Sequence, residues 1–320
     1  MEQEKINLLV QKIGDAKTIL IFGHKNPDGD SLGAVLGLRF LINDNFGKAA
    51  DIVYDGNLPF IYDFLPGRAE MVYIEKRPAK KYDLAISLDS PGMRQIGEAQ
   101  SALFNMAGDT VKIDHHKTGM DDDIANLNIA PAGFTASAEI IYEIAAAAGW
   151  KISANTANCL YLGIFTDTGG FNHIDNGNAM RAAAALVDLG ANARGVLPNL
   201  NVLTQEDIMA QGQVLANAEF FYGGKLAVAT IPNKLYKKLD SGETVLVQRL
   251  GGVRGVSAHA ILKEAKPAEI HASLRSKTVC VRAIAEKLGG GGHDFAAAAN
   301  LKMDLQSAKE TIVQAFEGIL

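Results

Sequence analysis

Short apolar runs that end in polar residues recur along the first half of the chain. Three of them, TILIFGH (residues 18–24), DLAISLDS (83–90) and TVKIDHH (110–116), predict buried parallel strands. Stretches with helical periodicity lie between and after these runs, at residues 31–42, 135–149, 154–165 and 178–190. Because strands alternate with helices, we expect an α/β fold built on a doubly wound sheet.

The pattern changes near residue 191. From 191 to 221 the sequence is polar and mostly helical, which is typical of a connector. A second set of strands and helices follows, with strands within 225–232, 255–265 and 269–277 and helices within 279–289 and 305–319. We therefore expect a first domain with a mainly parallel sheet flanked by helices at 1–190, a helical linker at 191–221, and a smaller α/β domain at 222–320.

Length and composition exclude several classes of protein. The 320 residues are 48% hydrophobic and 21% charged, which excludes a disordered, collagen-like or long coiled-coil chain. No apolar run reaches the roughly 18 to 20 residues of a membrane helix, and the charged N-terminus is unlike a signal peptide. Cys159 and Cys280 form no CxxC pair, which argues against a disulfide framework or a thiolate zinc site. We expect a cytoplasmic protein with no membrane partner.

The two parts of the chain differ in charge. Residues 1–220 hold 17 lysines and arginines against 27 aspartates and glutamates, whereas residues 221–320 hold 14 against 9. An acidic part suits divalent cations and a basic part suits anions, so this division is typical of a metal-dependent enzyme with a phosphorylated substrate. Random scatter of surface charge explains the same numbers equally well.

Metal-capable residues follow the predicted strands of the first part. Ligands of open α/β sheets bind beyond the carboxyl ends of the strands, where these side chains are expected to meet. They are His24, Asp28 and Asp30 in one Pro/Gly-bent loop, Asp89, the run Asp114–His115–His116, and Asp167 after an apolar helix. Converging carboxylates and imidazoles repel one another and lose solvation unless cations occupy the site, and mixed His/Asp ligands suit Mn or Mg. The sequence thus predicts a two-metal site.

Each of these motifs alone has a simpler structural explanation. Asp28 or Asp30 suits a helix N-cap, and Asp89 suits the cap of a turn. Arg94, shortly after Asp89, is expected either to contact a phosphate or to form a structural ion pair. Gly29–Gly33 also matches the G-x-S-x-G pattern of serine hydrolases, although the acidic residues around it favour a metal loop.

Taken in order, GHKNPDGDSLG, SLDS, IDHH and FTDTGGF resemble the four motifs of the DHH phosphoesterase superfamily. The tail, with SLRS at 273–276 and GGGGH at 289–293, is similar to the DHH-associated C-terminal domain. Length and layout resemble the branch of bifunctional oligoribonucleases and 3'-phosphoadenosine 5'-phosphate (pAp) phosphatases. The resemblance implies a DHH catalytic domain at 1–190 and a DHH-associated substrate-binding domain at 222–320.

The resemblance also implies a role for each motif residue. One Mn²⁺ is expected on His24, Asp28 and Asp89. The other is expected on Asp30, Asp89, His115 and Asp167, so that Asp89 bridges the two ions, and Mg²⁺ or Co²⁺ are alternatives to Mn²⁺. Such a pair of ions activates a water for in-line attack on phosphorus. Asp114 is expected to orient an imidazole, and His116 to face the scissile phosphate as a donor or proton source.

The C-terminal motifs predict a phosphate clamp. Arg275 can donate two hydrogen bonds to a phosphate, and the backbone amides of Gly290, Gly291 and Gly292, beside His293, can approach an anion closely. Ser273 and Ser276, which flank Arg275, are expected to assist. A clamp that holds one end of the substrate while the metals cut the adjacent bond favours short substrates. A flexible loop at a helix end is the alternative explanation of the glycines.

The implied function is hydrolysis of very short oligoribonucleotides to mononucleotides and dephosphorylation of pAp to AMP. Phosphodiesterase activity on linear or cyclic dinucleotides (pApA or the c-di-AMP type) and an exopolyphosphatase- or pyrophosphatase-like activity stay open, as does a non-enzymatic nucleotide sensor. The expected partners are short RNA oligonucleotides and 3',5'-bisphosphonucleotides, and not long duplex nucleic acid, because the second part is only mildly basic. A homodimer is compatible with the sequence.

Overall fold

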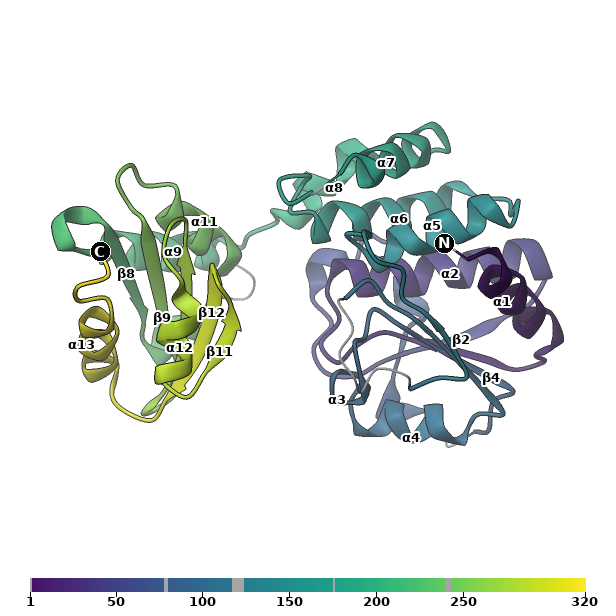
Figure 1. Cartoon of the computed structure of the whole chain (residues 1–320), viewed down its shortest axis with the longest axis horizontal. Helices are drawn as coiled ribbons and strands as arrows, with labels where there is room; N and C mark the ends of the chain where they lie inside the picture. The colour runs from purple at the N-terminus through teal and green to yellow at the C-terminus, as the bar shows by residue number, and fades with distance from the viewer. Residues whose placement is uncertain (1, 78–79, 117–123, 175, 240–242) are drawn as a thin grey trace. The chain divides into compact units, whose positions relative to one another are not determined.

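In the computed structural model the chain divides between Val202 and Leu203 into two units, which are described separately (Figure 1). The structure describes all residues except 1, 78–79, 117–123, 175 and 240–242. Among the described residues, no helix is both long and apolar enough to cross a membrane.

The first unit is built on a six-stranded parallel sheet. Its strands lie in the order β3-β2-β1-β4-β5-β6. They are β1 (Ile19–Phe22), β2 (Ala50–Tyr54), β3 (Val72–Tyr73), β4 (Leu84–Leu88), β5 (Asp109–Ile113) and β6 (Leu127–Ile129). The chain runs outward from β1 in both directions, so that β1 and β4 form the topological switch point where ligands of such sheets bind. The predicted α/β fold is confirmed.

Helices cover both faces of this sheet (Figure 1). In β1, Ile19 and Ile21 belong to the larger core on one face, whereas Leu20 and Phe22 belong to the smaller core on the other. The larger core is covered by α1 (Gln3–Asp15), α2 (Gly29–Phe46), α5 (Ser137–Ala147), α6 (Ala154–Asp167) and α7 (Asn178–Asp188). The smaller core is covered by α3 (Met93–Ile96) and α4 (Glu98–Met106). Burial on both faces explains why the strands are continuously apolar.

Helices α2 and α6 approach each other through glycines. A Cβ atom placed on Gly33 would lie 2.4 Å from the carbonyl oxygen of Cys159, and one on Gly163 would lie 2.8 Å from Oδ1 of Asp30. Both distances are shorter than van der Waals contact, so any side chain at these positions would separate the helices. The glycines thereby bring the N-terminus of α2 and the C-terminus of α6 together at the edge of the sheet.

The second unit contains a mixed six-stranded sheet in the order β11-β12-β10-β9-β8-β7. Its strands are β7 (Glu219–Phe221), β8 (Leu226–Ile231), β9 (Ala258–Lys266), β10 (Glu269–Ser276), β11 (Gly291–His293) and β12 (Ala296–Leu301). Only β8 and β9 run parallel among these pairs. One face packs on α12 (Val281–Lys287) and α13 (Leu305–Ala315), and the other on α9 (Gln205–Ala216) and α11 (Glu243–Gly251).

The longer elements match the sequence prediction, and the differences concern short or glycine-rich segments. The predicted linker range 191–221 contains α8 (Ala193–Leu200), α9 and β7, and the domain boundaries stay a prediction. The alternative explanation of the glycines, a loop at a helix end, holds for only part of the segment, because Gly291–His293 forms β11 beside β12. Gly292 has a φ of +139° and a Cβ there would lie 2.6 Å from the Ala296 carbonyl oxygen, so this glycine allows the strands to approach closely.

The glycine contact between α2 and α6 is tested with Gly33→Ala. We expect this variant to lower the free energy of unfolding by about 1–3 kcal/mol, because the added methyl group overlaps the backbone of α6. Chemical denaturation followed by fluorescence of Trp150, the single tryptophan, reports on the first unit.

Gly14→Ala is the matched control, since Gly14 lies in α1 with no atom near the added Cβ. That variant should be unchanged or more stable by up to about 1 kcal/mol. Equal effects of the two substitutions would contradict the close packing of α2 on α6.

Candidate metal centre

The loop after β1 places an imidazole and a carboxylate side by side. His24 Nε2 lies 3.6 Å from Oδ1 of Asp28, and Asp28 caps α2 by accepting hydrogen bonds from the amides of Asp30 and Ser31 at 3.0 Å. Asp28 is therefore the N-cap of α2 as well as a neighbour of His24. The Nδ1 atom of His24 lies 2.9 Å from the carbonyl oxygen of Lys25. Because a carbonyl only accepts hydrogen bonds, Nδ1 donates, which leaves Nε2 as the ligand atom.

Asp89 lies at the centre of the cluster. It directly follows β4, is only 2% exposed, and has a left-handed backbone with φ of +54°, which is strained for a residue other than glycine. Its Oδ2 lies 3.5 Å from His24 Nε2 and its Oδ1 lies 3.4 Å from His115 Nε2. Burial acts to raise its pKa, but hydrogen bonds to His115 and His24 hold the pKa below that of an ordinary aspartate. The two oxygens thus face different imidazoles.

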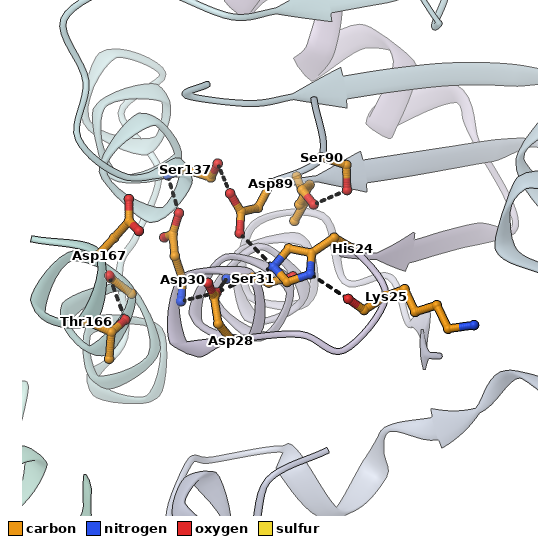
Figure 2. Close-up of polar contacts among 12 residues, drawn as sticks. His24, Lys25, Asp28, Asp30, Ser31, Asp89, Ser90, Ser137, Thr166 and Asp167 are labelled. Carbon is orange, nitrogen blue, oxygen red and sulfur yellow. Dashed lines mark hydrogen bonds and ion pairs between the residues drawn. The ribbon is translucent and has the colours of Figure 1, made fainter. Parts of the chain in front are cut away.

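Asp30 is held by the N-terminus of α5. This carboxylate is 1% exposed, and its two oxygens accept hydrogen bonds from the amides of Ser137 at 2.6 Å and Ala138 at 2.9 Å. Amides in the first turn of a helix are unsatisfied donors and carry partial positive charge, so they stabilise the carboxylate. Ser137 also donates from its hydroxyl to Asp89 at 3.2 Å (Figure 2). The sequence analysis did not identify Ser137, which lies at the start of a predicted helix with no motif around it.

His115 of the IDHH motif and Asp167 of the FTDTGGF motif lie close to Asp30. His115 follows β5, and its Nε2 lies 3.3 Å from Oδ2 of Asp167 and 4.0 Å from Oδ2 of Asp30. Asp167 is the last residue of α6, and Figure 2 shows it beside Asp30. Residues from α2, β5 and α6 thereby converge on one small volume.

Asp114 and His116 form a separate pair at the edge of this volume. Asp114 is completely buried, and its Oδ1 lies 2.8 Å from Nδ1 of His116. The other oxygen, Oδ2, has no hydrogen-bond partner among the described residues and lies 3.9 Å from Nζ of Lys112. Lys112 is also completely buried and donates to the carbonyl oxygen of Pro91 at 2.9 Å. Sequence analysis treated Lys112 as part of an apolar strand and missed this buried cation.

The predicted residues form three groups of candidate ligands. Within each group the ligand atoms all lie within 4.8 Å of one another. The groups are His24–Asp28–Asp89, Asp30–His115–Asp167 and Asp89–His115–His116. All of these residues except Asp30 line an open cavity of about 510 Å³, which is also lined by Lys25, Asn26, Pro91, Arg94 and Gln95. All eight predicted residues of the first unit are thus in or beside one site, and their roles as ligands stay a prediction.

Burial and charge shift the pKa values of this cluster. Burial, with the nearby Asp89 and Asp167, raises the pKa of Asp30 well above its ordinary value. Burial acts to lower the pKa of His24, but hydrogen bonds to two carboxylates raise it to about 11. The pKa of His115 is likewise raised to about 9 against burial, and burial raises that of Asp167 to about 6. At neutral pH the cluster therefore holds protons that a divalent cation would replace.

The donor set fits divalent cations. Among the described residues, the ion pairs of the four clustered aspartates are all with histidines, and none is with a lysine or arginine. Carboxylate oxygens and imidazole nitrogens together suit Mn²⁺ and related ions better than metals that prefer thiolates. Asp89, shared by two of the groups, is the residue best placed to contact more than one ion.

The predicted clamp residues of the second unit lie on neighbouring strands. Arg275 pairs with His259 of β9 and with Ala296 of β12, and Ser273 pairs with Ala298. Because side chains alternate along a strand, Ser273 and Arg275 share one face of the sheet. Gly291 and His293 of β11, which pair with Ala298 and Ala296, share the same face, whereas Gly290 precedes the strand and Gly292 alternates with its neighbours.

The side chain of Ser276 is used inside the fold. Its hydroxyl donates to the carbonyl oxygen of Ser257 at 3.2 Å and accepts from the amides of Thr278 and Val279 at 3.1 and 2.9 Å. The guanidinium of Arg275 donates to the carbonyl oxygen of Leu274 at 3.0 Å. Substrate binding by these residues stays a prediction.

His259 lies buried beside the clamp. Its side chain is 8% exposed, and Nε2 has no hydrogen-bond partner among the described residues. Burial, with the nearby cations Arg275 and Lys277, lowers the pKa of His259 to about 4. The folded protein therefore keeps this imidazole neutral at pH values where the unfolded chain, with an ordinary pKa near 6.5, binds a proton.

His259 is expected to make the second unit less stable in mild acid. The contribution of the neutral His259 to the free energy of unfolding is fully present above pH 6.5 and is lost as the pH falls towards 4. Between pH 7 and pH 5 we expect the free energy of unfolding of the second unit to fall by about 1 to 2 kcal/mol. Hydrogen exchange of β9 and β10, corrected for intrinsic rates, measures the opening free energy at the two pH values. His259→Asn removes the titration and should remove this part of the pH dependence. An unchanged pH dependence in that variant would contradict the assignment.

Comparisons with known proteins agree with the arrangement of the motifs. Residues 18–164 match the DHH family, N-terminal domain, and residues 223–320 match the DHHA1 domain. The chain is 30% identical over 317 residues to the bifunctional oligoribonuclease and PAP phosphatase NrnA of Thermus thermophilus, covering 98% of this chain and 93% of that protein. A protein of the same name from Mycoplasma genitalium is 30% identical over 305 residues, or 93% of each chain.

A solved structure shows the same fold. An exopolyphosphatase-related protein from Bacteroides fragilis aligns with a TM-score of 0.87, covering 99% of this chain and 96% of that chain. At 23% identity this likeness concerns the fold and not the substrate.

Proposed function

Because the chain belongs to the DHH phosphoesterase family and is thus a metal-dependent phosphohydrolase, we propose that it hydrolyses very short oligoribonucleotides and pAp. Similarity to NrnA proteins along nearly the whole chain supports these substrates. The observation that carries the proposal is the sharing of Asp89 between candidate ligand groups at the switch point of the sheet. The products would be mononucleotides from RNA and AMP from pAp.

Two Mn²⁺ ions are the proposed cofactors. His24, Asp28 and Asp89 would hold one, and Asp30, Asp89, His115 and Asp167 the other. Ions of this kind, when bound, neutralise phosphate charge and lower the pKa of water. The chain's own contribution is to fix the ligands in place, since the α5 amides hold Asp30 and Ser137 holds Asp89.

His116 is the proposed proton donor to the leaving oxygen. Asp114 accepts the Nδ1–H of His116 at 2.8 Å, and the imidazolium form of His116 carries a second proton on Nε2 that it can donate to the leaving oxygen. The His116 side chain is 43% exposed, so a phosphate in the cavity can reach it. Asp114 acts through His116 and is a positioning residue in this scheme.

The second unit is proposed to supply phosphate-binding groups. Arg275 and Ser273 share one face of its sheet with Gly291 and His293, where a guanidinium and a histidine can bind an anion. Gly290 and Gly292 lie beside that face, and a role of Ser276 would be indirect through the turn that its hydroxyl holds. Binding of one substrate end would favour short substrates.

Asp89→Asn tests the shared ligand. The substitution keeps the shape of the side chain but removes its charge, and we expect the kcat for pApA in Mn²⁺ to fall at least about 1,000-fold. The number of bound Mn²⁺ per chain, measured by equilibrium dialysis, should fall as well.

Asp188→Asn is the control, because Asp188 is an exposed aspartate at the end of α7. It should keep normal turnover, and Trp150 fluorescence should show that both variants fold. Near-normal turnover of Asp89→Asn would refute a central role of Asp89.

A further inference from the structure

Arg94 differs from most arginines of the first unit because it has no partner among the residues that the structure describes. Arg39, Arg68 and Arg77 contact the carboxylates of Glu70, Asp63 and Asp51. The Arg94 side chain is exposed, and within the described part of the chain its guanidinium makes neither a hydrogen bond nor an ion pair. The structural ion pair that the sequence allowed for Arg94 is therefore not found among the described residues.

This unpaired guanidinium lines the same cavity as the metal cluster. Lys25 lines it too, and its amine is 3.7 Å from Asp55, with the lysine side chain 53% exposed. Figure 2 shows the Lys25 side chain extending away from the clustered carboxylates. The cavity thus has an acidic part that suits cations and a basic part, formed by Arg94 and Lys25, that suits an anion.

The segments that carry the two cationic residues, the loop after β1 and the short helix α3, are joined to each other. The amide of Lys25 donates to the carbonyl oxygen of Gln95 at 2.7 Å. On the other side, the buried Lys112 donates to the carbonyl oxygen of Pro91 at 2.9 Å, just before the helix α3 that carries Arg94. A guanidinium on a fixed backbone loses less entropy when it binds a ligand. Arg94 is therefore suited to hold an anion at a defined distance from the cluster.

We propose that Arg94 and Lys25 form a second phosphate-binding subsite, which takes a phosphate monoester of the substrate that is not hydrolysed. This inference rests on the proposed function, because the hydrolysed phosphate lies at the metal cluster. In pAp the retained group is the 5'-phosphate, and in pApA it is the terminal 5'-phosphate. A cavity of about 510 Å³ lies in the range of pockets for ligands of nucleotide size. Arg94 is the main contact, since a guanidinium donates two parallel hydrogen bonds to a phosphate.

The test compares substrates with and without the second phosphate. Wild type, Arg94→Ala and Arg94→Lys are assayed in Mn²⁺ with pAp and with adenosine 3'-phosphate, which lacks the 5'-phosphate. We expect Arg94→Ala to raise the KM for pAp about 10- to 100-fold with kcat nearly unchanged, and to leave the KM for adenosine 3'-phosphate within about twofold. Arg94→Lys keeps the positive charge but cannot donate two parallel hydrogen bonds. Its KM for pAp should therefore lie between those of wild type and Arg94→Ala.

Arg181→Ala is the matched control. Arg181 is an exposed arginine of α7 in the same unit, it contacts Asn178, and it does not line the cavity. It should behave as wild type with both substrates. If Arg94→Ala raises the KM for both substrates by the same factor, or raises neither KM, the subsite is refuted.

Binding without turnover separates this inference from the proposed function. Calorimetry of metal-free protein should show that pAp binds wild type at least about tenfold more tightly than adenosine 3'-phosphate, and that Arg94→Ala abolishes the difference. A wild type that hydrolyses neither compound but shows this difference would overturn the proposed function and support the subsite. A wild type that hydrolyses both without any preference for pAp, in KM or in binding, would overturn the subsite and leave the function standing.

Discussion

Repulsion among four aspartates at the carboxyl edge of one parallel sheet is the constraint around which the first unit is arranged. Asp89 leaves β4 with a strained left-handed backbone that places its oxygens between His24 and His115. Asp30 is stabilised by two amides at the start of α5, and Gly163 leaves the space that Asp30 occupies. Each of these features fixes a carboxylate in a buried place, where its charge is costly without bound cations.

The same constraint explains the division of charge along the chain. The acidic part supplies the carboxylates for the metal cluster, and the basic part, residues 221–320, carries Arg275 and His293 on one sheet face. Within the first unit, Arg94 and Lys25 line the cavity beside the cluster. Under the proposed function, the hydrolysed phosphate of a substrate would face the cluster and another phosphate would face these two cations.

The sequence predicted those parts of the fold and site that depend on local pattern. The apolar runs ended in His24, Asp89 and Asp114, and the parallel order of the strands brought those ends together as expected. It did not predict the contact of Lys112, because the run at 110–116 predicts only an apolar buried strand, whereas the Lys112 amine reaches the carbonyl oxygen of Pro91 inside the fold. Ser137 was missed for a similar reason, since its contacts to Asp30 and Asp89 join residues about a hundred and about fifty positions apart. The short strand at Gly291–His293 depends on pairing with β12, which local propensity does not encode.

The most direct test of the account measures products from metal-stripped protein supplied with Mn²⁺, with pApA, pAp, a 24-nucleotide RNA and pyrophosphate assayed in parallel. The account predicts release of AMP from pApA and pAp, no turnover without added metal, and little cleavage of the long RNA or pyrophosphate. Preferential hydrolysis of pyrophosphate, or cleavage of the long RNA as fast as pApA, would contradict a site that acts on short nucleotides.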